Sequence, residues 1–262
     1  MPNHEHLKLL LAGAVTWTQW RNQNPEVEID LSYANLQREN LRGANLQAVN
    51  LHQADLSHSL LVRTNFSQAI LSSANLSNSK LVEANFYQAN LTLANLQYAT
   101  LKAANFQDVI LIGANLQRVN LQDAVITNAN LIGTDLIFAN LKNADLASSQ
   151  LIRSHLSFAN LIGANLVFAD LQKAVLYEAE MMQCYLYQAN LSKANLTRCH
   201  LGSCFLSRAN LSGANLTNAD LSFANLTAAN LSGANLTGAN LRGANLTNAN
   251  LTGAIMPKTD DD

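Results

Sequence analysis

The chain has 262 residues and a formal net charge of −2, with only 13% charged and 6% aromatic residues. This balance excludes the strongly basic domain that is typical of nucleic-acid binding and the acidic composition of a tail-like interaction surface. Heavy use of Leu, Ala and Asn predicts internal repeats, and no apolar run approaches the roughly 18 residues that a membrane span needs.

The first predicted element is one helix over residues 4–24. Its apolar residues recur at steps of three or four, which is the spacing of one helix face. Asn3 is suited to cap its first turn. We therefore expect residues 1–29 to form a helical cap and connector, with Trp17 and Trp20 packed on the start of the next element.

Residues 30–256 repeat with a period of five. From Leu31 to Met256 every fifth residue is apolar, over 46 positions that never slip, and 40 of them are Leu. Two residues before each lies a second register, mostly Ala, and the position between the two is mostly Asn or Asp. In each unit of five residues, the Leu and Ala positions are therefore suited to a core, and the other three positions are mostly polar or small.

A spacing of five fits neither a helix nor a flat strand. On a helix it spreads apolar side chains around all faces, and on a strand it alternates between the two faces. The pattern is consistent if each pentapeptide is one short side of a closed coil that bends at every corner, with Asn or Asp bonding the nearby backbone.

The tandem pattern A-(N/D)-L-x-x, as in Ala44-Asn45-Leu46 and in the run over residues 209–251, resembles the pentapeptide repeat family. The resemblance covers residues 30–256 and implies an all-β fold, a right-handed quadrilateral parallel β-helix with four pentapeptides per coil. The segment that precedes it, W-x-x-W-R-x-x-N-P, is similar to a leader of bacterial, especially cyanobacterial, members.

The phenylalanines support a coil of 20 residues independently of the resemblance. Phe66, Phe86 and Phe106 are the only aromatics at the large apolar position, and they are 20 residues apart. Four sides per coil would stack the three rings in one column. The repeat then makes about eleven and a half coils, none of which is stable without its neighbours.

A few residues break the inward pattern. Glu39 occupies an Ala position, where we expect a buried carboxylate satisfied by an indole, an arginine or water, with Ser59 and Ser79 continuing a polar column. Cys184, Cys199 and Cys204 also occupy Ala positions. We expect three buried, inert thiols, with a disulfide as the alternative.

No motif links the six histidines to each other or to the cysteines, and an unbroken prism leaves no cleft for catalysis. The sequence therefore predicts a protein that is not an enzyme and that holds no metal or cofactor. The absence of a basic, apolar leader predicts a cytoplasmic protein with reduced thiols.

Outward apolar side chains gather in the middle coils. Folded onto two adjacent walls they would make a contiguous patch, of the kind that marks an interface, although β-branched ladders can also simply stabilise a sheet face. The candidate partner interface comprises Tyr98, Ile112, Ile132, Ile137, Phe138, Ile152 and Phe158.

Charges at the two positions after each Leu are twelve basic and four acidic, so we expect walls that lean basic. The function predicted is a non-catalytic scaffold that binds an unknown protein partner through its outer faces. The alternative is the DNA mimicry by which some family members bind type II topoisomerases, which basic-leaning walls and the lack of loops disfavour. Residues 257–262 are predicted to be an acidic tail, and a homodimer through the last coil or the apolar patch is open.

Overall fold

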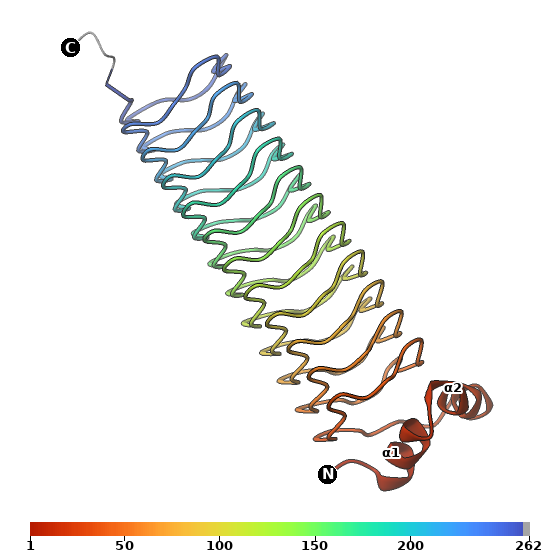
Figure 1. The fold of residues 1–262 in the computed structure, drawn as a ribbon. Helices are drawn as coiled ribbons and strands as arrows, with labels where there is room; N and C mark the ends of the chain where they lie inside the picture. The colour runs from red at the N-terminus through yellow and green to blue at the C-terminus, as the bar shows by residue number, and fades with distance from the viewer. Residues whose placement is uncertain (259–262) are drawn as a thin grey trace.

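The computed structural model describes residues 1–258. Two helices, α1 (His4–Leu11) and α2 (Ala14–Gln23), lie at the N-terminal end of a straight stack of coils that continues to the other end of the rod (Figure 1). Of the predicted tail over residues 257–262, residues 259–262 lie outside the described residues.

The prediction of one helix over residues 4–24 is wrong, because the helix is interrupted after Ala12. Gly13 has a φ of 113°, which is not helical, and α2 starts beyond it without a side-chain cap. The apolar spacing continues across the break and conceals it. Asn3 caps α1 as expected, since its side chain accepts the N–H of Glu5 at 2.9 Å.

The helices cover the open end of the first coil, as the sequence predicts. Trp17 is fully buried, and its indole N–H donates to the carbonyl of Asn45 at 2.7 Å. Trp20 stacks on it at 5.7 Å, and Arg21 donates to the carbonyl of Gln47 at 2.9 Å. The cap therefore satisfies backbone groups that no preceding coil can reach.

One coil contains 20 residues, because every backbone bridge joins residues 20 apart and in parallel, from Asp30 with Asn50 to Asn235 with Ile255. The chain therefore forms a β-helix of four pentapeptides per coil. Each pentapeptide contributes a single bridged residue, at the Asn position. The Leu amide also reaches the next coil, as where Leu31 donates to the carbonyl of Asn50 at 2.8 Å.

The two residues after each Leu form a corner, closed by the Ala amide donating back to the Leu carbonyl. We call them the first and second corner positions. The second has a φ near +57° almost throughout, as in Arg153 and Phe158, which fits the third residue of a type II turn. The backbone thus bends after each Leu, as the spacing predicts.

Leu and Ala positions both point inward and fill the coil. From Leu31 to Leu236 the large position is at most 1% exposed. Phe66, Phe86 and Phe106 stack in one column with centroid distances of 5.0 and 4.7 Å, which confirms the predicted coil size. Over residues 31–236 the interior is a packed core without an inner channel.

Asn side chains link the coils along the outside. In Asn210, for example, Oδ1 accepts the amide of Ser212, which leaves Nδ2 to donate to Asn190 of the coil before it. Asn190, Asn210, Asn230 and Asn250 form one such ladder, which begins at Asp170 with a bond of 3.0 Å. These amide ladders run from coil to coil on the surface.

Glu39 is half-exposed, so the prediction of a buried carboxylate is wrong. It belongs to the first coil, where it is the one partly exposed residue at an Ala position, since Ala34, Ala44 and Val49 are buried. Ser59 and Ser79 are buried as expected. The hydroxyl of Ser59 donates to the carbonyl of Leu36 at 2.7 Å, which satisfies it without the cap.

Candidate interaction surface

The outer surface has three registers, not two, because the Asn position also faces outward. A flat side of the prism consists of a second corner position, the next Asn position and the following first corner position. Gln117 shows this, since it donates to Asp135 of the same side at 2.6 Å. The two residues of one corner therefore project onto two different sides.

Two adjacent sides carry the predicted interface residues other than Ile112, Ile132 and Ile152, and we name each of the two by a histidine at its Asn position. The His155 side has Asn115, Asp135, His155, Val175 and Asn195 along its centre, and the His200 side has Asn140, Asn160, Glu180, His200 and Asp220. They share the corner at which Phe138 and Phe158 lie.

The predicted patch does not form one contiguous surface. Phe138 and Phe158 stack at 4.9 Å, but Arg118 separates them from Tyr98 and places its guanidinium 4.5 Å from the ring centroid of Phe138. Tyr98 therefore does not stack on the two phenylalanines. Arg118 binds the ring instead, through a cation–π contact.

The isoleucines lie at another corner. Ile112, Ile132 and Ile152 form one column as predicted, but the polar centre of the His155 side, with Asp135, lies between them and the phenylalanines. Ile137 alone lies beside Phe138. The sequence could not show this separation without knowing that consecutive corner residues diverge.

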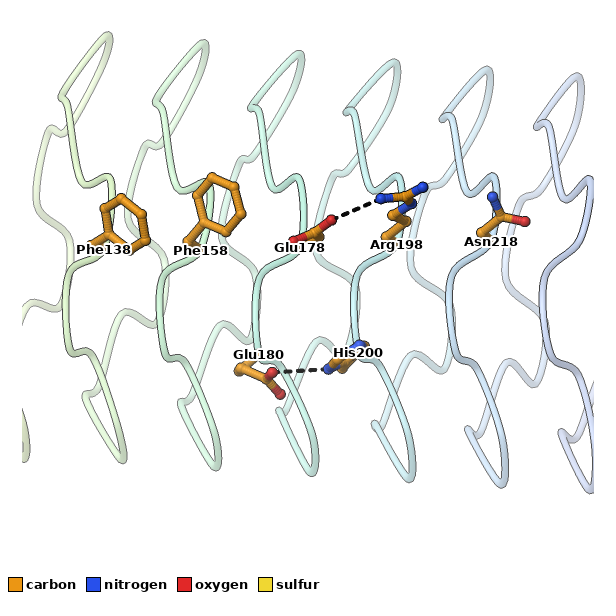
Figure 2. Close-up of a pocket in the computed structure, with 7 residues that line it drawn as sticks. All are labelled: Phe138, Phe158, Glu178, Glu180, Arg198, His200 and Asn218. Atoms are coloured by element: carbon orange, nitrogen blue, oxygen red, sulfur yellow. Dashed lines mark hydrogen bonds and ion pairs between the residues drawn. The ribbon is translucent and has the colours of Figure 1, made fainter.

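Phe138 and Phe158 continue into a column of charge on the His200 side (Figure 2). The pair borders an open hollow of about 480 Å³, lined further by Glu178, Glu180, Arg198, His200 and Asn218. Arg198 donates to Glu178 at 3.1 Å, and the Nδ1 of His200 lies 2.9 Å from Glu180. All four of these side chains remain accessible to solvent.

The hydroxyl of Tyr177 and then the guanidinium of Arg198 lower the pKa of Glu178 below its ordinary value. Tyr177 also packs edge-on against Phe158 at 5.5 Å. Tyr177 therefore contacts both Phe158 and the ion pair of Glu178 with Arg198, and it connects the His155 side with the His200 side at this corner.

A second aromatic group was not predicted from the sequence. Tyr185 and Phe205 replace Asn at the centre of another side, where they are exposed and stack at 5.0 Å. At the next corner Phe168 meets Tyr187 at 5.8 Å. The signal was the loss of Asn from its register, which indicates an exposed apolar residue once that register is known to face outward.

The walls do not lean basic, contrary to the expectation. Aspartates at the Asn position also reach the surface, and the count over residues 30–256 becomes thirteen basic and twelve acidic side chains. Several of these carboxylates accept backbone amides. At Asp30 the amide of Ser32 is the main cause that lowers the pKa of the carboxyl group.

Cys184, Cys199 and Cys204 are free and buried. Burial raises the pKa of Cys184 and of Cys199 well above the ordinary value. Over residues 1–258 no cluster of three or more His, Cys, Asp or Glu side chains could hold a metal ion. In that same stretch neither helix has the length and apolar character to cross a bilayer.

The sequence profile described as "Pentapeptide repeats" matches overlapping segments that together span residues 27–256. Comparison with curated proteins gives no match. Among solved structures, HetL from the cyanobacterium Nostoc sp. strain PCC 7120 is 34% identical, with 85% of this chain and 92% of that chain covered and a TM-score of 0.43. HetL is described as a pentapeptide repeat protein involved in heterocyst differentiation regulation.

Two other structures match less fully. Rfr23 from the cyanobacterium Cyanothece 51142 is 38% identical over 39% of this chain and 63% of that chain, with a TM-score of 0.21. QnrB1, a plasmid-mediated fluoroquinolone resistance protein, is 20% identical over 87% of this chain and 94% of that chain, with a TM-score of 0.30. Since the profile covers most of the sequence, the chain belongs to the pentapeptide repeat family.

Proposed function

We propose that the chain is a non-catalytic interaction module that binds a protein partner through the outer sides of its middle coils. Pentapeptide repeat proteins are generally protein-interaction modules. The scaffold that presents this surface is, we infer, a right-handed coil of about 11.5 turns, as the family resemblance implies.

The observation that carries this proposal is where the outward aromatic residues lie. Eleven Phe and Tyr residues occupy outward registers, and eight of them lie between residues 138 and 223. The last coils, by contrast, present mostly Asn, Ser, Thr and Gly. Aromatic residues are enriched in the buried centre of interfaces, so their concentration in these coils favours a docking surface there.

Phe138 and Phe158 are the best candidates for its centre. They are 46% and 39% exposed, already stacked, and held between Arg118 and Tyr177, so that little side-chain entropy is lost on binding. The charged hollow beside them supplies the polar rim that interfaces typically have.

The double variant Phe138→Lys/Phe158→Lys tests this. We expect it to fold normally, because both positions are corners outside the core, and to lose a partner that the parent retains in affinity capture from the source cell. His58→Lys/Asn78→Lys is the matched control, since it places two lysines in the same column but nearer the N-terminal end of the rod. Equal capture by the parent and the phenylalanine variant, with circular dichroism unchanged, would contradict the proposal.

No observation favours the alternative, a DNA mimic that binds a type II topoisomerase. Mimicry of DNA needs a continuous negative surface, and the thirteen basic side chains of residues 30–256 interrupt the twelve acidic ones on every wall.

A further inference from the structure

Three basic residues form a column at one edge of the His155 side. Arg153, Lys173 and Lys193 occupy the second corner position of three consecutive coils, and we call them the basic ladder. Their φ values are 57°, 60° and 58°, so the three side chains leave the backbone in the same direction. Successive coils are about 4.8 Å apart, so like charges are held close together.

This arrangement is unusual within the chain. In the other outward columns where two Asp, Glu, Lys or Arg side chains lie on consecutive coils, the charges are opposite and paired. Arg63 contacts Glu83 at 2.7 Å, and Arg198 contacts Glu178 at 3.1 Å. The basic ladder is the exception in this respect, since none of its members belongs to an ion pair among residues 1–258.

The ladder is also isolated by glycine. The same column continues as Gly113 and Gly133 on one side and as Gly213, Gly233 and Gly253 on the other. Long basic side chains therefore rise from an edge that is otherwise bare, and all three are exposed. Like charges directly opposite one another destabilise a sheet, so stability does not explain the ladder.

We propose that the basic ladder, together with Tyr177 at the opposite edge of the same side, binds an acidic, extended segment of a protein partner. Tyr177 lies across the side from Lys173, with Val175 between them, and it packs on Phe158. The ladder would receive carboxylates while the partner's apolar side chains reach Val175 and Tyr177. This inference rests on the proposed function and names the chemistry of the partner.

A nucleic acid fits this surface less well. Asp135 and Asp170 lie beside the ladder, on the coil below and on the adjoining side, and would repel a continuous polyanion. Three cations neutralise few phosphates, whereas nucleic-acid binding proteins usually contact many more. The ring of Tyr177 is half-buried, and Ser157 and Thr197 precede and follow it in its column, so the side offers no run of aromatic rings on which successive bases could stack.

The test uses a fluorescein-labelled peptide, Gly-Glu-Phe-Glu-Phe-Glu-Gly, and its glutamine analogue, with fluorescence anisotropy at about 50 mM salt, where exposed charges are weakly screened. We expect the Glu peptide to bind the parent and the Gln peptide to bind at least several-fold more weakly. Arg153→Gln/Lys173→Gln/Lys193→Gln should weaken binding of the Glu peptide by about tenfold, the sum of three exposed ion pairs.

The matched control is Lys142→Gln/Arg208→Gln/Arg242→Gln, which removes the same charge from three positions that are not on consecutive coils of one column, and it should change the affinity less than twofold. Loss of repulsion should also raise the thermal midpoint of the ladder variant above that of the control. Equal weakening by both triple variants, or equal binding of both peptides, would overturn the proposal.

A short duplex DNA provides the third arm. If it displaces the Glu peptide from the ladder at a lower concentration than unlabelled Glu peptide does, the acidic-segment proposal is overturned in favour of a nucleic acid. The assay needs no natural partner, so its failure refutes the ladder alone, whereas failure of the Phe138 and Phe158 capture experiment refutes the interface.

Discussion

The three cysteines show how a position in the repeat sets the chemistry of a residue. Cys184, Cys199 and Cys204 replace Ala, and each thiol donates to a backbone carbonyl, as where Cys204 donates to Met181 at 2.7 Å. A buried thiol at such a position packs as a small apolar side chain does.

The raised pKa values predict how stability depends on pH. In the unfolded chain the thiols ionise near their ordinary pKa of about 8.5, whereas folding raises the pKa of Cys184 and Cys199 and keeps them protonated. The unfolded state then binds fewer protons, so the free energy of unfolding should fall as the pH rises from about 8.5 toward the folded pKa.

Denaturant unfolding at neutral and at alkaline pH measures this dependence. Cys184→Ala/Cys199→Ala/Cys204→Ala is the control, because it retains every other titrating group. The parent should lose more stability than this variant between the two pH values. Identical losses would show that the thiols ionise as easily in the fold as outside it.

The N-terminal cap is the element whose energetics depend most on one side chain. Trp17 is fully buried between α2 and the first coil, and its N–H satisfies the carbonyl of Asn45. Trp17→Ala should lower the free energy of unfolding of the first coils by about 3–5 kcal/mol, through lost burial and a cavity.

Trp17→Phe separates the two contributions. It retains most of the apolar area but leaves the Asn45 carbonyl without its donor, at a cost of about 1–3 kcal/mol. Hydrogen exchange of the amides in residues 31–50 reports on this region directly. Protection unchanged in Trp17→Ala would mean that the cap does not stabilise the coil beneath it.

The sequence predicts some levels of this fold and not others. The core registers follow from the period of five, and the coil length follows from Phe66, Phe86 and Phe106, because each depends only on spacing. The break at Gly13 is invisible, since the apolar spacing continues through it. The candidate surface was predicted only in part. The backbone of each corner directs its first and second residues onto different sides, and this places the His155 side between Ile132 and Phe138.

At the scale of the whole molecule, the rod is nearly neutral and its charges are mixed. Every wall carries both acidic and basic side chains, and Asp55 and Asp145 also accept hydrogen bonds from neighbouring amides. We therefore expect no inhibition of DNA supercoiling by a bacterial type II topoisomerase. An assay with purified enzyme checks this, with a DNA-mimic family member as positive control, and inhibition at comparable concentrations would contradict our interpretation of the charge.

The amide ladders give the rod a chemical direction. Where an Asn side chain bonds to the preceding coil, it donates toward the helical cap, as Asn165 does to Asp145 and Asn240 to Asp220, and an aspartate has no hydrogen to donate in turn. A carboxylate can therefore only be the first member of an amide ladder, because it accepts from the next coil and cannot donate to the coil before it. Shuffling or duplicating whole coils would keep the leucine interior intact, yet an aspartate inserted midway would sever the run at that level. The Asn and Asp residues on the surface thus distinguish one coil from the next, whereas the Leu and Ala residues of the interior are nearly the same in every coil.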